Sequence, residues 1–282
     1  MLSYEERLNS DSRWALSEGS KHFEERSAVQ LALRQIAQRL EELGIPYAVA
    51  GGMALFAHGL RRFTEDVDIL VTREGLNVIH SELEGRGYVP PFSGSKNLRD
   101  AVHGVRIEFL VAGQFPGDGK PKPVAFPDPA RVGVESDGIR YLNLPTLVEL
   151  KLASGMSSEH RLKDLADVQE LIKLQELPEQ FVEQLDPYVQ AKYRELYAAT
   201  RPSAARYYLP WPRPSSAASI ANLDDLIAEV ARIGSDIAQL EKMRTDGVTL
   251  ASDRGALGGY VYLATVDPGV AAKYGMHEES QI

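Results

Sequence analysis

The chain has 282 residues, enough for one large or two modest domains, and its content of 44% hydrophobic and 25% charged residues is ordinary for a folded globular protein. Its formal net charge of −9 argues against a broad, non-specific nucleic-acid surface but leaves room for a local basic patch. The absence of cysteine excludes disulfides, thiolate chemistry and thiolate zinc sites.

The N-terminal sequence and the apolar runs predict a cytoplasmic protein without a membrane partner. Residues 1–7 are polar and acidic, and no apolar segment of a secretory signal follows them. The most apolar stretch, residues 45–60, contains two adjacent glycines and a histidine and is too short to span a bilayer.

Periodic apolar residues predict the elements of the first half of the chain. Residues 1–25 are polar and are expected to be irregular, and Ser27 is a candidate cap for a helix whose apolar positions run from Val29 to Leu43. Beyond that helix the pattern predicts a buried strand over 45–50, a short helix over 53–58, a strand over 66–71, a helix over 74–85 that opens after Thr72, an edge strand over 88–92 and a strand over 101–112.

Residues 113–130 are rich in glycine and proline and are predicted to form a long loop. Two interpretations stay open, because long loops within compact domains are often functional: a mobile surface loop, or a lid that contacts a substrate. Short strands are expected over 131–142, followed by three helices at about 145–155, 161–174 and 178–198. Strands that alternate with helices and then give way to a helical run predict an α/β (α+β) fold.

Composition divides the chain into five segments. These are an N-terminal polar segment (1–27), a core (28–142), a helical segment packed on the core (143–199), a Pro/Ser/Ala-rich linker (200–219) and a C-terminal helix with a small α/β appendage (220–282). Within the linker, Tyr207, Tyr208 and Trp211 form an aromatic cluster that is expected to pack on the domain rather than to bind a ligand.

A stripe of apolar residues marks the C-terminal segment. Its members recur at spacings of three and four over about two and a half heptads: Leu223, Leu226, Val230, Ile233, Ile237 and Leu240. Such a stripe either joins two copies of the chain in a homodimer through residues 223–240 or folds against its own domain. Beyond it the sequence predicts short strands near 248–250 and 260–265 and a helix over 268–274.

Two of the predicted strands carry polar residues on one face and bulky apolar residues on the other. Asp66 and Asp68 share a face, because alternate residues of a strand point the same way. Glu108 lies on the corresponding face of the strand over 101–112, together with Arg106. Strands with such matching patterns can lie side by side in one sheet, where their acids would converge.

Converging carboxylates are costly unless a cation lies between them. Oxygen ligands suit Mg²⁺ (or Mn²⁺), which usually binds one or two protein carboxylates together with substrate phosphates. Asp66, Asp68 and Glu108 are therefore candidate metal ligands and catalytic residues for an in-line displacement at phosphorus. The alternative is a solvated strand face, although aspartate is poorly suited to strand interiors.

Gly51 and Gly52 follow a predicted strand and open a predicted helix, a place where backbone N–H groups can hold phosphate oxygens. The alternative is a tight turn that binds nothing. Read together with the acids downstream, the two glycines become candidate phosphate contacts.

The run Gly51-Gly52, thirteen residues, then Asp66-Val67-Asp68, with a later strand acid at Glu108, resembles the nucleotidyltransferase superfamily with the DNA polymerase β-like fold. Residues 62–69 look like the minimal bacterial members, which include the group related to abortive-infection toxins. The resemblance covers about residues 28–175. It implies a mixed sheet with flanking helices, a site for a divalent metal and a nucleoside triphosphate (NTP), and transfer of a nucleoside monophosphate to an acceptor hydroxyl. Two positions depart from the family pattern: Gly52, where serine is frequent, and Glu108, where aspartate is commoner.

The predicted helix after the sheet carries a further candidate, Lys151, which could reach a triphosphate as a point charge. The segment resembles the helical part of the toxin-like members. Asp164 and Asp167 lie three residues apart on one helix face, where they could orient Lys151 or Arg161. The alternative is a surface ion-pair cluster that contributes little to stability.

Arg62 and Thr64 lie just before the acids and, with Asp164, complete the candidate nucleotide-binding residues. The predicted function is metal-dependent transfer of a nucleoside monophosphate to a hydroxyl of an RNA end, a protein or a small molecule, with the toxin of a toxin–antitoxin pair as one candidate role. A non-catalytic nucleotide-binding or interaction module of the same fold, such as an antitoxin-like partner, is the alternative. The complete set of three acids weighs against it.

Overall fold

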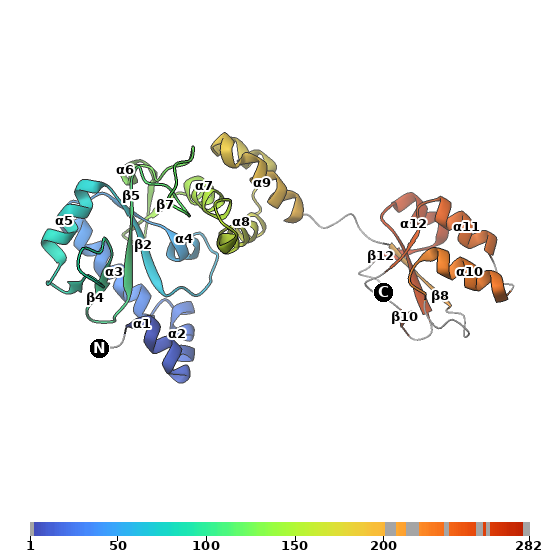
Figure 1. Cartoon of the computed structure of the whole chain (residues 1–282), viewed down its shortest axis with the longest axis horizontal. Helices are drawn as coiled ribbons and strands as arrows, with labels where there is room; N and C mark the ends of the chain where they lie inside the picture. Colours follow the sequence, from blue (N-terminus) through green and yellow to red (C-terminus); the bar gives the residue numbers. More distant parts are fainter. Residues whose placement is uncertain are drawn as a thin grey trace. The chain divides into compact units, whose positions relative to one another are not determined.

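The computed structural model describes residues 3–200, 207–212, 220–233, 237–251, 256–257 and 260–278. The chain forms two compact units, Met1–Thr200 and Arg201–Ile282 (Figure 1). In the described residues, the first unit has a seven-stranded sheet and the second a five-stranded sheet. No helix among these residues is long and apolar enough to cross a membrane.

The sheet of the first unit is mixed, as predicted. Its strand order is β3-β4-β5-β2-β1-β7-β6, with β2 parallel to β5 and antiparallel to β1. The strands are β1 (Tyr47–Val49), β2 (Asp66–Val71), β3 (Tyr88–Val89), β4 (Leu98–Asp100), β5 (Arg106–Val111), β6 (Gly133–Ser136) and β7 (Ile139–Leu142). The pair β2–β5 therefore lies near the centre of the sheet, with β3 at an edge, where its following prolines are tolerated.

Helices cover both faces of this sheet. On one face, α3 (Ala28–Glu42) and α5 (Arg73–Leu83) pack on the alternate residues Val67, Ile69 and Val71 of β2. On the other face α4 (Gly51–Ala57) packs on β2 and α7 (Leu144–Gly155) lies beside it, while α8 (Leu162–Leu174) and α9 (Pro187–Thr200) pack on α7. Leu70 belongs to this second core, so the acids that share its strand face point toward α4 and α7.

Local sequence explains where these helices begin. Ser27 caps α3 in a capping box with Gln30, and Thr72 caps α5 by accepting the N–H of Gly75, as the sequence predicts. Asn143 caps α7 in the same way. The remaining short elements of the unit are α6 (Pro129–Val132) and two 3₁₀ turns, η1 (Glu159–Arg161) and η2 (Glu179–Gln184).

Two predicted elements differ in extent from the structure. The predicted strand over 101–112 is shortened to β5, and its first residues form the turn that joins β4 to β5, because Asp100 accepts the N–H groups of Val102 and His103 and Gly104 turns with a φ of +73°. The predicted helix over 178–198 becomes η2 and α9, since Pro187 is suited to a helix start but not to a helix interior.

The prediction that residues 1–25 are irregular is wrong. They form α1 (Tyr4–Ser10) and α2 (Ser12–Phe23). Ser3 and Glu6 make a capping box at α1, and the Asp11 side chain caps α2. Tyr4 is buried with its ring edge-on to that of Trp14, at 5.3 Å between centroids, so a few apolar residues dock an otherwise polar hairpin of helices.

The second unit begins inside the predicted linker. Residues 207–212 of that linker form β8 (Tyr207–Pro212), which pairs with β11 (Tyr260–Thr265) and with β12 (His277–Glu278). Tyr208 is fully buried and Trp211 packs on the unit's core, so the aromatic cluster does pack on a domain, as part of its sheet. The other residues of the predicted linker, apart from Thr200 at the end of α9, lie outside the described residues. The remaining elements are β9 (Thr249–Leu250), β10 (Ala256–Leu257) and α12 (Pro268–Tyr274).

The apolar stripe lies on two helices, α10 (Leu223–Ile233) and α11 (Ile237–Thr245), rather than one. Leu226, Val230 and Leu240 are buried in the hydrophobic core of the second unit. The structure therefore shows the stripe folded against its own unit, the second of the two interpretations. A homodimer through residues 223–240 would require these side chains to leave that core, and it stays a prediction.

His22 ties the N-terminal helices to the segment before the acids. Its imidazole is buried, Nε2 donates to the carbonyl oxygen of Arg62 at 3.0 Å, and the rings of Phe56 and Phe63 lie 5.4 and 5.2 Å away between centroids. Burial lowers the pKa of His22, because the charged imidazolium loses its hydration.

We predict that the free energy of unfolding decreases as the pH falls through the ordinary histidine range near 6.5, since the unfolded chain then binds a proton that buried His22 resists. In urea denaturation between about pH 7 and about pH 5, His22→Gln should flatten this dependence. The control is His160→Gln, whose side chain is exposed and should leave the slope unchanged. A His22→Gln protein with the wild-type slope would contradict this account.

Candidate active site

The three predicted metal ligands converge on one face of the sheet. Strands β2 and β5 pair in parallel, with Asp68 directly opposite Glu108. One oxygen each of Asp66, Asp68 and Glu108 lie within 4.8 Å of one another, and all three side chains are partly buried. The predicted side-by-side placement of the two strands, with their acids on a shared face, is confirmed.

The cluster is under electrostatic strain. Burial, followed by the neighbouring charges of Asp66 and Glu108, raises the pKa of Asp68 to about 7. Arg106 supplies a partial counter-charge, since its Nη2 donates to Asp66 Oδ2 at 2.7 Å and its Nη1 lies 3.3 Å from Glu108 Oε1. One guanidinium cannot neutralise three carboxylates, so the cluster keeps excess negative charge when all three are ionised.

Arg106 also connects the cluster to the N-terminal helices. Glu5 of α1 lies 3.8 Å from Arg106 Nε and accepts a hydrogen bond from Arg99 Nη1 at 2.7 Å. The Nε of Arg106 is buried and makes no hydrogen bond within the described residues. Sequence reasoning missed this role of Arg106, although its position two residues before Glu108 on the same strand face was a usable signal. The part played by Glu5 had no such signal.

Gly51 and Gly52 let the backbone approach the acids. Gly51 has a φ of +56°, and a Cβ on it would lie 1.7 Å from Asp68 Oδ2. A Cβ on Gly52 would lie 2.6 Å from the hydroxyl oxygen of Thr64, which donates to Asp66 Oδ1 at 3.0 Å. The side chain of Ala50 makes no cap to the first N–H groups of α4. Each glycine thus makes room for a polar group of the acidic cluster.

A second polar network lies on α7 and α8, on the same side of the sheet. Lys151 is only 7% exposed, and its Nζ donates to Asp164 Oδ1 at 2.8 Å and to Asp167 Oδ2 at 2.7 Å. Ser154 donates to the other oxygen of Asp164 at 2.7 Å. Arg62 pairs with both oxygens of Asp167, at 2.8 and 3.0 Å. The prediction that Asp164 and Asp167 orient Lys151 matches these contacts.

The neighbours of Asp164 favour its ionised form. Burial alone would raise the pKa of Asp164, but the Lys151 ammonium and the hydrogen bonds from Lys151 and Ser154 outweigh it and hold the pKa below its usual value. An ammonium group has three N–H donors, and the described residues accept two of those of Lys151, so the third can meet a ligand.

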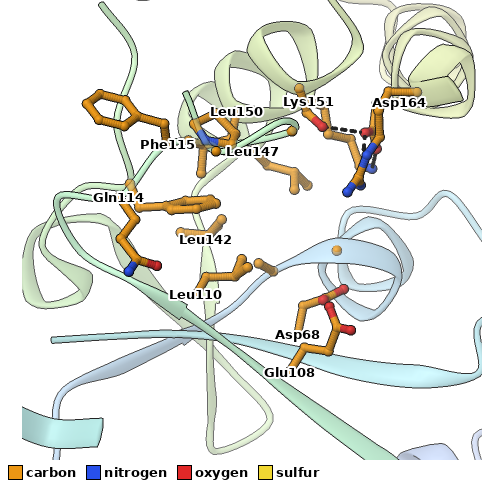
Figure 2. Close-up of a pocket in the computed structure, with 18 of the residues that line it drawn as sticks. Asp68, Glu108, Leu110, Gln114, Phe115, Leu142, Leu147, Leu150, Lys151 and Asp164 are labelled. Carbon is orange, nitrogen blue, oxygen red and sulfur yellow. Dashed lines mark hydrogen bonds and ion pairs between the residues drawn. The ribbon is translucent and has the colours of Figure 1, made fainter. Parts of the chain in front are cut away.

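A cavity of about 620 Å³ joins the two polar networks (Figure 2). Asp68 and Glu108 line it from the sheet, while Lys151 and Asp164 line it from the helices. Gly51 also reaches the cavity, with its backbone. Acids and a lysine therefore face one space, large enough for a small-molecule ligand.

The long loop predicted over 113–130 forms part of the cavity wall. Its last two residues belong to α6 rather than to the loop. Gln114, Phe115 and Asp118 are among its lining residues. Within the loop, Lys122 Nζ donates to the carbonyl of Pro116 and to Asp118 Oδ1, both at 2.6 Å. Of the two interpretations of this segment, contact with a ligand is the one that the cavity favours.

Two predicted phosphate contacts lie elsewhere. Arg62 and Thr64 do not line the cavity; the first is engaged with Asp167 and the second with Asp66. Asp164 does line it, but its carboxylate would repel a phosphate and instead holds Lys151. These three side chains are placed to position other groups, because each already has a charged partner.

No family model and no curated sequence matches the chain. Three of the solved structures that resemble it are nucleotidyltransferases or nucleotidyltransferase-like proteins. ANT(2″)-Ia, solved with adenylyl-2″-tobramycin, is 13% identical, with a TM-score of 0.40 over 59% of this chain and 97% of that one. An antigenic nucleotidyltransferase-like protein from Paracoccidioides brasiliensis is 17% identical (TM-score 0.34, 51% of this chain, 75% of that one). A candidate nucleotidyltransferase from Thermotoga maritima is 20% identical (TM-score 0.29, 51% and 89%). Likeness this low carries no argument about what the chain does.

We predict that Gly51→Ala displaces the Asp68 carboxylate from the cluster, because the new Cβ would occupy its place. In metal-free protein, carboxyl NMR titration should then show the Asp68 pKa falling from about 7 toward the ordinary aspartate range. Gly44→Ala is the matched control, since Gly44 has a similar φ of +64° but nothing within 4 Å of its Cβ position. Both variants should lose about 1–2 kcal/mol of stability to backbone strain. An unchanged Asp68 pKa in Gly51→Ala would contradict the proposed contact.

Proposed function

We propose that the chain is a divalent-metal-dependent nucleotidyltransferase, which transfers a nucleoside monophosphate from an NTP to an acceptor hydroxyl. The observation that carries the proposal is the acidic triad of Asp66, Asp68 and Glu108, with oxygens within 4.8 Å, two of whose members, Asp68 and Glu108, line a cavity that Lys151 also lines. A solvated strand face would not place two acids of such a triad and a buried lysine around one space.

The triad fits a divalent cation. All its donors are carboxylate oxygens, the ligands that Mg²⁺ and Mn²⁺ prefer. Burial and then the like charges of Asp66 and Glu108 raise the pKa of Asp68, and a bound cation would relieve that repulsion. Asp66, Asp68 and Glu108 would hold the metal, which when bound supplies charge neutralisation at the phosphates and a lowered pKa for the acceptor hydroxyl.

The residues of the chain have separate tasks in this proposal. The third N–H of Lys151, for which the described residues supply no acceptor, would bind an oxygen of the triphosphate. Backbone N–H groups of Gly51 and Gly52 would hold another. The acceptor oxygen forms a bond to the α-phosphorus while the bond from that phosphorus to the bridging oxygen breaks, and pyrophosphate leaves. Glu108, which lies opposite Asp68 on the neighbouring strand, would accept the proton of the acceptor hydroxyl.

An RNA end, a protein hydroxyl and a small-molecule hydroxyl stay the candidate acceptors, and a toxin role stays one candidate setting. One observation favours the second candidate function, a nucleotide-binding module without turnover. Arg106 already pairs with Asp66 and lies beside Glu108, so a protein cation partly fills the place of a metal. Tight NTP binding without release of pyrophosphate would favour that module.

We predict that the wild-type protein transfers label from an α-labelled NTP to total RNA, protein or a panel of small-molecule alcohols when Mg²⁺ or Mn²⁺ is present, and that a chelator stops it. Asp68→Asn should reduce transfer about a hundredfold or more, because it removes a charged ligand and not merely a contact. The measurement is incorporated label against time.

The control for this experiment is Glu135→Gln, an exposed acid on β6 that does not line the cavity and should leave transfer unchanged. Loss of fold does not explain the expected result, since neutralising Asp68 relieves repulsion and should leave the melting temperature at or above that of the wild type. Absence of transfer from wild type to every acceptor class, or wild-type transfer by Asp68→Asn, would refute the proposal.

A further inference from the structure

The cavity continues from the acidic triad into an apolar end that phosphate transfer does not use. Five apolar side chains line this end: Leu110, Phe126, Leu142, Leu147 and Leu150. In Figure 2, Leu110 and Leu142 lie between Asp68 on one side and Gln114 on the other. The apolar end is therefore continuous with the place where a triphosphate would bind.

The loop that closes this end is held in place by its backbone. The N–H of Phe126 donates to the carbonyl of Gln114, and the N–H of Gly113 donates to the carbonyl of Phe126, both at 2.8 Å. The backbone of Asp118 is tied to the turn that follows α7, since its N–H donates to Ser157 Oγ at 3.2 Å. The two ends of the loop, which carry Gln114 and Phe126, are thus bonded to each other, and its middle is bonded to Ser157.

Gln114 offers an unused recognition group. Its side chain is partly buried and lines the cavity, and its carboxamide makes no hydrogen bond within the described residues. A carboxamide presents a donor and an acceptor side by side, the pattern that reads the edge of a heteroaromatic base. The neighbouring Phe126 has an aromatic face on which a planar base can stack.

We propose that this apolar end binds the base of the NTP, with Phe126 as a stacking surface and Gln114 as the residue that discriminates between bases. The inference rests on the proposed function, because it assumes that the triphosphate lies between the triad and Lys151. A base is planar, largely apolar on its faces and polar at its edge, which matches apolar walls with one carboxamide. A polycationic acceptor is a poor match, because its ammonium groups would lose their hydration against five apolar side chains.

Calorimetry of the full-length protein with Mg²⁺ tests the proposal without turnover. The ligands are the four α,β-methylene nucleoside triphosphate analogues, which cannot release pyrophosphate, and inorganic tripolyphosphate, which has no base. The preferred analogue should bind wild type at least about tenfold more tightly than tripolyphosphate, the gain typical of stacking one base. Gln114→Ala should narrow the spread of affinities among the four analogues, and Phe126→Leu should weaken all four by about tenfold.

Tripolyphosphate binding should stay at the wild-type value in both variants, which also reports that they are folded. Lys120→Ala is the control within the same loop, because Lys120 is exposed and does not line the cavity. Analogues that bind wild type no better than tripolyphosphate, or an unchanged spread in Gln114→Ala, would overturn the base site and leave the proposed transfer standing. Failure of wild type to bind tripolyphosphate and the analogues alike would overturn the proposed function as well.

Discussion

Repulsion among the carboxylates of Asp66, Asp68 and Glu108 is the constraint on which the rest of the site depends. This repulsion arises from the parallel pairing of β2 with β5, because the register places Asp68 directly opposite Glu108. The neighbouring features follow from it: a glycine at position 51, where any Cβ would meet Asp68, and Arg106 as a partial counter-charge. A divalent cation completes this arrangement better than the guanidinium, since it can contact all three acids at once.

The helices contribute the opposite charge through a buried network. Lys151 would be expensive to bury alone, but Asp164 and Asp167 hold it in place, and Arg62 balances the second acid. Removal of one partner from such a network typically costs about 3–5 kcal/mol, because an unpaired buried charge is left behind. The network therefore keeps the Lys151 ammonium at the cavity wall, with one N–H for which the described residues supply no acceptor.

Much of the site could be predicted from sequence, because alternation along 66–71 and 101–112 places the acids on one strand face each. The register between the two strands could not be predicted, since a shift of two residues would keep the same side chains on the same strand faces. The contact of Arg62 with Asp167 spans 105 residues and depends on tertiary packing. The helices over 4–23 were missed because few apolar residues mark them, although the caps at Ser3 and Asp11 were visible. Strand β8 is not predicted, because its prolines suggest a linker. In the described residues, β12 pairs only with Tyr207 and Tyr208 of β8. The half of β8 that contains the prolines therefore has one open edge, where prolines are tolerated.

The central claim is that the triad is a metal site, and direct binding of Mn²⁺ tests it most simply. Electron paramagnetic resonance of free Mn²⁺ during a titration counts bound ions without requiring an acceptor or a nucleotide. The account predicts saturable binding to wild type that is lost or strongly weakened in Asp66→Asn, whose carboxylate is one of the three ligands. Wild-type protein that binds no Mn²⁺ at millimolar concentrations, or an Asp66→Asn variant that binds it equally well, would contradict the account.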